Sequence, residues 1–373
     1  MALVYDRVNK WGGAERVLLA LHEIFPEAPL YTAVYSPEKA PWAKVFPKIV
    51  PSFLNKIKFF QDKHEYLAPL MPLAFESFNF DEYDLVISVT SEAAKGIITK
   101  PKTLHVCYCL TPTRYLWSHY GEYFKGPTLK AVSKPIINHL RSWDKIAAQR
   151  PDVMVGISTA VQGRIKKYYE RESEVIYPPV DIDRFKILDS RFKKRDYYLF
   201  VSRLIPYKRA DLAVEAFNEL GLPLKIVGTG SEEAKLKRIA KKNIEFFGFI
   251  DDSDLAKLYQ GAKALIFPGE EDFGIVMVEA LASGTPVIAY KAGGALDIVK
   301  EGKTGIFFES QEVGSLISAI KRFDEPVRQS LAQQALAGGS TYKNMSLDCI
   351  KNAERFKKEN FKERFLDLVK RKL

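Results

Sequence analysis

Short apolar runs alternate with amphipathic stretches along most of the chain, and glycine, proline or charged residues bound most of these runs. Short, bounded apolar runs predict buried strands, and apolar residues at helical spacing between them predict helices. The runs that predict strands lie at 2–5, 84–89, 104–109, 152–158, 198–201, 224–231, 244–250, 264–267, 286–290 and 304–308. Because strands and helices alternate, the sequence predicts an α/β protein with parallel sheets.

Two consecutive prolines, Pro178 and Pro179, interrupt this rhythm near the middle of the chain. Prolines favour extended backbone and remove N–H donors, so they predict a linker at this point. We therefore expect an N-terminal domain at 1–180 and a C-terminal domain at 181–350. The last residues, 351–373, carry apolar positions at helical spacing and predict a C-terminal helix.

The stretch 267–290 has polar residues at a place where such folds bind ligands. A predicted strand ends at Phe267, an acidic loop with Glu271 follows, and a helix then leads to the next strand. Residues 273–275 would form the first turn of that helix, where free N–H groups bind anions. Two interpretations stay open for Glu271 and Glu279. In the first, the two carboxylates bind hydroxyl groups at the two ends of a nucleotide-sugar, on either side of its diphosphate. In the second, Glu271 is a solvated loop acid and Glu279 is a residue on the helix surface.

Residues 271–274, Glu-Asp-Phe-Gly, and 279–287, Glu-Ala-Leu-Ala-Ser-Gly-Thr-Pro-Val, together resemble the signature of family 4 glycosyltransferases, the retaining GT-B enzymes. The resemblance implies that Glu271 is the catalytic residue, which contacts and positions the donor sugar. It implies that Glu279 binds the ribose of the nucleotide. The backbone amides that it places at the phosphates are those of Phe273, Gly274 and Ile275.

The same resemblance implies the GT-B fold, in which two Rossmann-like domains face a cleft and a C-terminal helix returns to the first domain. The C-terminal domain would hold the nucleotide-sugar donor, and the N-terminal domain would hold the acceptor. The resemblance covers nearly the whole chain and is strongest from Tyr198 to Phe308.

Two basic residues, Arg203 and Lys208, follow the predicted strand at 198–201. A strand-to-helix loop is the usual place for phosphate ligands, and arginine offers a planar fork where lysine offers a mobile point charge. Taken alone, they would be ordinary surface cations, but they match the diphosphate clamp of the family. The next residue, Arg209, stands where relatives often have glycine.

Weaker features add two assignments to the expected donor site. The Gly12-Gly13 turn after the first strand permits close backbone approach. Taken alone, the two glycines indicate a plain tight turn at least as well as a ligand-binding loop. The family, however, places such a loop under the donor diphosphate. In the family the backbone after Gly248 meets the nucleobase, so Phe249 and Ile250 are the expected base contacts.

The loop 111–117 follows the predicted strand at 104–109 and resembles a stretch that many relatives write as His-Thr-Pro-x-Arg-Tyr. Thr111 and Arg114 are therefore the candidate acceptor-binding residues. Leu110 occupies the position of the histidine, and its side chain cannot form a hydrogen bond. A histidine contact to the sugar or the acceptor is thus not carried over to this chain.

Composition limits the expected partners. With 373 residues and a formal net charge of +10, the chain favours anionic partners such as nucleotides, nucleic acid or an anionic membrane. Cys107, Cys109 and Cys349 lack the spacing of a zinc site, so we expect buried thiols, a reducing compartment and no metal. No apolar run approaches the roughly 18 residues of a membrane span. We expect a cytoplasmic protein that attaches peripherally to the inner face of the membrane.

The segment 39–78 interleaves basic and aromatic residues. They are Lys44, Lys48, Lys56, Lys58 and Lys63, with Trp42, Phe46, Phe53, Phe59 and Phe60. Such a segment binds an anionic membrane or a nucleic-acid strand, or it is a solvated face above core aromatics. We expect a membrane surface as the partner and no nucleic acid.

The resemblance implies a retaining hexosyltransferase that needs no cofactor. No metal is expected, because Arg203 and Lys208 can neutralise the phosphates. Its donor would be a nucleoside-diphosphate sugar, GDP-mannose-like by first expectation and a UDP-sugar by second. Its acceptor would be a hydroxyl of a glycan or of a lipid-linked acceptor. The loop 111–117 resembles that of mannosyltransferases and related enzymes of surface-polysaccharide assembly, which is the reason for placing a GDP-sugar first. The alternative is a non-catalytic nucleotide-sugar or nucleic-acid binding protein, and the paired glutamates disfavour an epimerase of the same fold.

Overall fold

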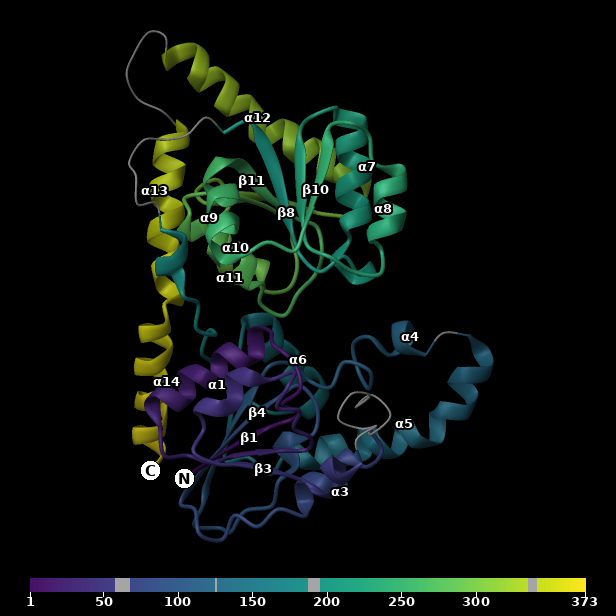
Figure 1. Cartoon of the computed structure of the whole chain (residues 1–373), viewed down its shortest axis with the longest axis vertical. Coiled ribbons are helices and arrows are strands. Elements are labelled where there is room, and N and C mark those ends of the chain that lie inside the picture. Colours follow the sequence, from purple (N-terminus) through teal and green to yellow (C-terminus); the bar gives the residue numbers. More distant parts are fainter. Residues whose placement is uncertain (58–67, 125, 187–194, 335–340) are drawn as a thin grey trace. The chain divides into compact units, whose positions relative to one another are not determined.

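The chain divides into two units, each built around its own parallel sheet (Figure 1). The computed structural model describes residues 1–57, 68–124, 126–186, 195–334 and 341–373. Unit 1 consists of Met1–Pro179 together with Lys358–Leu373, and unit 2 consists of Val180–Lys357. The chain therefore passes from unit 1 to unit 2 directly after the two prolines, and it returns to unit 1 for its last residues.

The described strands of unit 1 form a seven-stranded parallel sheet in the order β3-β2-β1-β4-β5-β6-β7. The strands are β1 (Ala2–Tyr5), β2 (Leu30–Thr32), β3 (Ile49–Pro51), β4 (Leu85–Thr90), β5 (Leu104–Cys109), β6 (Val153–Gly156) and β7 (Glu174–Val175). Its α-helices are α1 (Gly13–Ile24), α3 (Met71–Glu76), α4 (Tyr120–Tyr123), α5 (Pro127–Ala147), α6 (Thr159–Tyr169) and α14 (Lys358–Lys372). Short 3₁₀ helices are η1 (Pro41–Val45), η2 (Phe53–Lys56) and η4 (Ala94–Gly96).

The described strands of unit 2 form a six-stranded parallel sheet in the order β10-β9-β8-β11-β12-β13. The strands are β8 (Tyr197–Val201), β9 (Leu224–Val227), β10 (Ile244–Gly248), β11 (Ala262–Phe267), β12 (Val287–Tyr290) and β13 (Gly305–Phe308). The α-helices are α7 (Ala210–Leu220), α8 (Glu233–Ile239), α9 (Asp252–Gly261), α10 (Ile275–Ala282), α11 (Ala295–Ile298), α12 (Val313–Gln334) and α13 (Thr341–Ala353). The 3₁₀ helices are η5 (Ile182–Phe185), η6 (Pro206–Lys208) and η7 (Glu354–Phe356).

The central strands are buried on both faces, which explains their continuous apolar sequence. Every residue of β4 is buried, and so is every residue of β8. Parallel sheets are covered by helices on both sides, so their strands lack the alternation of half-exposed strands. In unit 2 the core includes Phe217 of α7 and Ile320 of α12, which pack with Ile266 of β11.

The C-terminal helix α14 packs on unit 1, as expected (Figure 1). Its residues Phe361 and Phe365 are buried, and their rings lie 5.7 and 6.2 Å from the ring of Tyr108 on β5. Lys358 at its start forms an ion pair of 2.9 Å with Glu23 of α1. The helix ends with three basic residues, which suit the negative end of a helix dipole.

The structure also contains strands that the hydrophobic pattern did not predict. They are β2, β3 and β7, which are three, three and two residues long. Runs this short carry too few residues to show a pattern. The helix α1 begins at Gly13, so the second glycine of the predicted turn is already helical.

Candidate functional site

Unit 2 has a topological switch point between β8 and β11. After β8 the chain adds β9 and β10 on one side, and it then returns to place β11 on the other side of β8. Ligands of open α/β sheets bind at such a point, beyond the carboxyl ends of the two strands. The loops 202–209 and 268–274 leave the sheet here. They approach closely, since a Cβ on Gly269 would lie 3.0 Å from the carbonyl oxygen of Tyr207.

Lys208 and Glu271 meet at this switch point. The Nζ of Lys208 forms a hydrogen-bonded ion pair with Oε1 of Glu271. Their side chains are 11% and 20% exposed, so the pair is largely withdrawn from water. A small pocket here is lined by Phe200, Val201, Ser202, Lys208, Phe267, Pro268, Gly269 and Glu271. The fold thus brings an expected phosphate-binding cation into contact with the expected sugar-binding carboxylate.

Tyr207 links the two basic residues of the first loop. Its hydroxyl accepts a hydrogen bond of 3.1 Å from Nη2 of Arg203, whose side chain is exposed. Its ring centroid lies 5.0 Å from Nζ of Lys208, within the range of a cation–π contact. Sequence reasoning missed Tyr207, although its place directly before Lys208 was an available signal.

Two adjacent glycines support the loop that carries Glu271. A Cβ on Gly293 would lie 2.2 Å from the carbonyl oxygen of Glu271, and one on Gly294 would lie 2.3 Å from that of Phe273. Gly293 also has a φ of +61°, which favours glycine. The N–H of Gly294 donates to the carbonyl oxygen of Glu271 at 2.8 Å. The sequence displays this Gly-Gly pair after β12, but only the fold reveals its role.

The helix α10 begins at Ile275, so the expected first turn at 273–275 is wrong in its bounds. Gly274 precedes the helix with a left-handed φ of +97°, and a Cβ there would lie 2.4 Å from Cε of Met277. Glycine therefore meets both a conformational and a steric demand. The ring of Phe273 is buried, with its centroid 5.5 Å from that of Phe356. Any ligand contact of Phe273 has to come from its backbone.

Glu279 lies one turn into α10, and its side chain is buried. The interpretation of Glu279 as a helix-surface residue is therefore wrong. The hydroxyl of Tyr259 on α9 donates to Oε2 of Glu279 at 3.2 Å. Tyr259 is itself held in place, because its carbonyl oxygen accepts a hydrogen bond of 2.6 Å from the hydroxyl of Thr285. No motif marks Tyr259 in the sequence, since its partner is 20 residues away.

The expected base contacts follow the edge strand β10. Phe249 is 86% exposed, and Ile250 is half-buried. The turn before them requires a left-handed residue, which Gly248 supplies with a φ of +66°. An aromatic ring exposed to this extent can stack on a planar partner.

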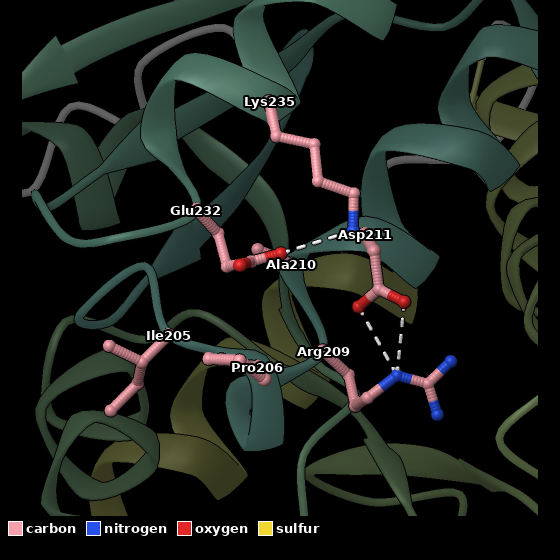
Figure 2. A pocket seen from close by; sticks show the side chains of 7 residues that line it. All are labelled: Ile205, Pro206, Arg209, Ala210, Asp211, Glu232 and Lys235. Atoms are coloured by element: carbon pink, nitrogen blue, oxygen red, sulfur yellow. Dashed lines mark hydrogen bonds and ion pairs between the residues drawn. The ribbon is translucent and has the colours of Figure 1, made fainter.

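A cavity of about 240 Å³ lies beside the loop 202–209 (Figure 2). It is lined by Ile205, Pro206, Arg209, Ala210, Asp211, Glu232 and Lys235. The Nε of Arg209 donates to both carboxylate oxygens of Asp211 at 3.2 Å, and Nζ of Lys235 donates to Glu232 at 3.2 Å. Because these four charges are paired, the cavity has no excess positive charge for a diphosphate. Arg209 has a φ of +54°, a strain of about 1–3 kcal/mol that a glycine would avoid.

Unit 1 has its own switch point, between β1 and β4. Gly12 is the N-cap of α1, and Gly13 is the first residue of the helix. Glu15 is buried in the first turn and accepts a hydrogen bond of 2.8 Å from the hydroxyl of Tyr5. A Cβ on Gly12 would lie 3.2 Å from Oε2 of Glu15. Within unit 1, the lack of a side chain at Gly12 thus makes room for the carboxylate of Glu15.

Asp6 connects the two strands of this switch point. It follows β1 and accepts hydrogen bonds from the last residue of β4 and from the segment after that strand. The donors are the hydroxyl of Thr90 and the N–H groups of Ser91, Glu92, Ala93 and Ala94. Burial and the neighbouring Glu92 carboxylate raise the pKa of Asp6.

A buried ion pair joins η4 to α5 beside the loop 111–117. The Nζ of Lys95 lies 2.6 Å from Oδ1 of Asp144, and both side chains are buried. Burial lowers the pKa of Lys95, but the charge and hydrogen bond of Asp144 outweigh this effect, so the pKa is raised. Asp144 also accepts hydrogen bonds from the hydroxyl of Thr113 at 3.0 Å and from the indole of Trp117 at 2.7 Å. No pattern in the sequence indicates this pair, because its members lie 49 positions apart.

The candidate acceptor residues lie at the carboxyl end of β5. Thr111 is buried, and its hydroxyl has no hydrogen-bond partner among the described residues. An unsatisfied buried hydroxyl costs about 1–3 kcal/mol. Arg114 is half-buried in the same loop, and Leu110 is half-buried just before it.

In the described part of the basic and aromatic segment 39–78, the lysines are exposed, but only some of the aromatic side chains are. Lys44, Lys48 and Lys56 are exposed. The indole of Trp42 donates to the carbonyl oxygen of Lys10 at 2.8 Å, and Phe46 is buried with its ring 4.8 Å from that of His22. Phe53 is exposed. Lys58, Phe59, Phe60 and Lys63 lie outside the described residues.

The described part of the chain contains no group of three or more histidine, cysteine, aspartate or glutamate residues placed to hold a metal ion. None of the three cysteines forms a disulfide, and all are buried, which raises the pKa of Cys107 to about 11. Of the described helices, none is long and apolar enough to span a bilayer.

Comparison with known proteins identifies the domain in unit 2. Residues 183–336 match the family model of glycosyl transferases group 1. An uncharacterized glycosyltransferase of Methanocaldococcus jannaschii is 27% identical over 202 residues, which cover 52% of this chain and 56% of that protein. D-inositol 3-phosphate glycosyltransferase 2 of Catenulispora acidiphila is 31% identical over 173 residues, covering 39% and 40%. The chain spans about half the length of these curated relatives.

Solved structures resemble the chain over nearly its full length. The Anabaena protein HepE in complex with UDP is 19% identical, with a TM-score of 0.71, and the match covers 99% of this chain and 100% of HepE. At this identity the likeness shows the fold alone. It confirms the expected GT-B fold, with two parallel-sheet α/β domains and a C-terminal helix.

Proposed function

We propose that this chain is a retaining glycosyltransferase that moves a sugar from a nucleoside-diphosphate sugar to a hydroxyl. One observation carries the proposal. Within a glycosyl transferases group 1 domain, Arg203, Lys208 and Glu271 converge at the switch point of the sheet. Cations and a carboxylate at this place suit a ligand that has both a diphosphate and sugar hydroxyls.

The proposed donor site divides the nucleotide-sugar among its residues. Arg203 and Lys208 bind the diphosphate together with the backbone amides at the start of α10. Glu279 accepts hydrogen bonds from the ribose hydroxyls, oriented by Tyr259. Phe249 and Ile250 contact the base. We also propose that the Gly12-Gly13 turn contacts the diphosphate.

The proposed chemistry depends on stabilising the leaving diphosphate. Positive charges that are already in place stabilise developing negative charge without reorganisation during the reaction. Arg203 and Lys208 are two such charges, and we therefore propose transfer without a metal ion. Glu271 holds the sugar so that its anomeric carbon faces the acceptor hydroxyl.

For the acceptor we propose a hydroxyl of a glycan or a lipid-linked sugar. Thr111 and Arg114 are the proposed contacts, because a polar acceptor group near the Thr111 hydroxyl would relieve its unsatisfied burial. The Lys95–Asp144 pair holds Thr113 and Trp117 of the same loop in place. GDP-mannose is the first donor to test and a UDP-sugar the second.

We further propose that unit 1 docks on an anionic membrane, and α5 now adds a surface for this. Val132 and Ile136 are 71% and 49% exposed, with Lys130 and Lys134 exposed beside them. No acidic residue lies between Glu122 and Asp144. Exposed apolar residues among lysines, without acids, suit the interface of an anionic bilayer.

Acceptor-free hydrolysis tests the proposed activity. Radiolabelled GDP-mannose and UDP-glucose are incubated with the protein, with and without a polysaccharide acceptor, and the released diphosphate is measured. Release of GDP or UDP in step with sugar transfer is expected. Binding of a nucleotide-sugar without release or transfer would favour a second function, a non-catalytic nucleotide-sugar binding protein. The observation that favours this second function is Leu110, which stands where the family has a histidine.

A further inference from the structure

The ion pair between Lys208 and Glu271 joins two groups that the proposed donor would use separately. We infer that this pair makes the site discriminate between the nucleotide-sugar and the free nucleoside diphosphate. The inference rests on the function proposed above. It assigns Glu271 a second role, as competitor of the diphosphate for Lys208.

The Lys208–Glu271 pair is largely buried. Both side chains are mostly withdrawn from water, and a charge in such a place is strongly destabilised when its partner is removed. A ligand that takes Lys208 must therefore also satisfy Glu271. A carboxylate accepts hydrogen bonds only, so it needs a donor such as a hydroxyl group.

The two nucleotides differ in this respect. A free nucleoside diphosphate offers phosphate oxygens to Lys208, but it lacks the transferable sugar whose hydroxyls would reach Glu271. It therefore leaves that carboxylate unpaired beside another anion. A nucleotide-sugar offers phosphate oxygens to Lys208 and hydroxyl donors to Glu271 at once. The nucleotide-sugar therefore gives both Lys208 and Glu271 a new partner when their ion pair breaks. The free diphosphate gives a new partner to Lys208 alone.

The surrounding backbone keeps the two groups within reach of each other. Gly293 and Gly294 pack directly against the loop that carries Glu271. Gly269 packs against the backbone of Tyr207 and Lys208. After transfer, the sugar hydroxyls leave, and Glu271 again competes for Lys208. The pair would thus favour release of the nucleoside diphosphate at the end of a reaction cycle.

Calorimetric titration of the whole chain with GDP, GDP-mannose, UDP and UDP-glucose tests the inference. Glu271→Gln keeps the shape of the side chain and removes its charge. We expect this variant to bind the nucleoside diphosphate about tenfold more tightly, a change of about 1.4 kcal/mol. The ratio of nucleotide-sugar affinity to diphosphate affinity should fall by a similar factor or more.

Glu270→Gln is the matched control, because it removes the same charge from an exposed neighbour. It should change the affinities for both nucleotides alike and leave their ratio unchanged. A Glu271→Gln variant that binds the diphosphate no more tightly than Glu270→Gln would overturn the inference.

A double-mutant cycle separates competition for Lys208 from direct repulsion by Glu271. In a Lys208→Gln background, competition predicts that Glu271→Gln no longer tightens diphosphate binding. Tightening that persists in this background would show direct repulsion and overturn the inference. A wild-type chain that binds none of the four nucleotides would refute the proposed function itself, which is a different result from an unchanged ratio.

Discussion

Glu270 and Glu271 are adjacent acids with different surroundings. Glu270 is exposed, whereas Glu271 contacts Lys208 beside a loop that Gly293 and Gly294 support. The packed backbone therefore holds the charge of Glu271 at the switch point. Glu270 provides a control for the effect of charge alone.

Glu271→Ala should lower turnover by roughly 10²–10³, the loss expected when a group that acts in the transition state is removed. The variant should still fold, because the side chain lies in a loop and outside the described core clusters. Its melting temperature should fall, because the largely buried Lys208 loses its partner. Initial rates with saturating donor, together with thermal unfolding, measure both effects. Glu270→Ala should keep most of the activity. Wild-type turnover in Glu271→Ala would refute the role of Glu271.

His105 in β5 makes stability depend on pH. Its Nε2 lies 2.8 Å from the Ser88 hydroxyl, and burial, with Arg150 and Arg171 nearby, lowers the pKa of His105 from 6.5 to about 3. Below pH 6.5 the unfolded chain binds a proton that the folded chain does not. The free energy of unfolding should therefore fall as pH drops from 6.5 towards 3, by up to about 1.4 kcal/mol per pH unit from this group.

His105→Gln removes this titration and keeps a hydrogen-bonding side chain. Chemical denaturation between pH 7 and pH 4.5 should show a weaker pH dependence in the variant, by about one proton. Parallel pH dependences in wild type and variant would contradict the assigned pKa shift of His105.

Among the elements, the apolar strands could be predicted because parallel strands are buried on both faces. The runs at 104–109 and 264–267 correspond to β5 and to the last residues of β11. The helix start at Ile275 could not be predicted as easily, since the hydrophobic pattern shows neither the left-handed φ of Gly274 nor the side chains of Met277 and Phe267 that a Cβ there would meet.

The candidate site was predictable where residues are close in sequence or match a family pattern. The signature from Glu271 to Val287 and the Arg203 and Lys208 pair are of this kind. The direct contact of Lys208 with Glu271 joins positions 63 residues apart, and that of Asp6 with Thr90 joins positions 84 apart. Such contacts are set by strand order, which the hydrophobic pattern does not specify.

Gly294→Ala tests how the segment between β12 and α11 supports the acidic loop. Gly294 has an ordinary φ of −67°, so alanine adds only a collision with the backbone of Phe273. Displacing Glu271 by about 1 Å should lower kcat/KM by up to about 10²-fold. Gly314→Ala is the matched control, since its Cβ would meet nothing within 4 Å. Equal kcat/KM values in both variants would show that the glycine contact is unimportant.

For the whole molecule, the net charge of +10 and the exposed surface of α5 predict salt-sensitive binding to anionic vesicles. Each lysine near an anionic leaflet contributes about 1 kcal/mol, and salt screens this attraction. Liposome co-sedimentation should show binding that needs anionic lipid and weakens in high salt.

Two sets of substitutions distinguish the two candidate surfaces. One variant alters α5 and combines Lys130→Gln, Val132→Ser and Lys134→Gln. The other alters the segment 39–78 and combines Lys44→Gln, Lys48→Gln and Lys56→Gln. We expect the α5 variant to lose more binding, because it removes apolar contact as well as charge. A wild-type chain that stays in solution with anionic vesicles at low salt would refute membrane docking.

The central claim for the whole molecule is that unit 2 binds a nucleoside diphosphate through Arg203 and Lys208. Calorimetric titration with GDP and UDP, and with guanosine and uridine, tests it most directly in wild type and in Arg203→Ala and Lys208→Ala. Each lost charge-assisted hydrogen bond is worth about 1.5–3 kcal/mol, so each variant should bind the diphosphate at least about tenfold more weakly and the nucleoside almost unchanged. Equal weakening of diphosphate and nucleoside would contradict the claim.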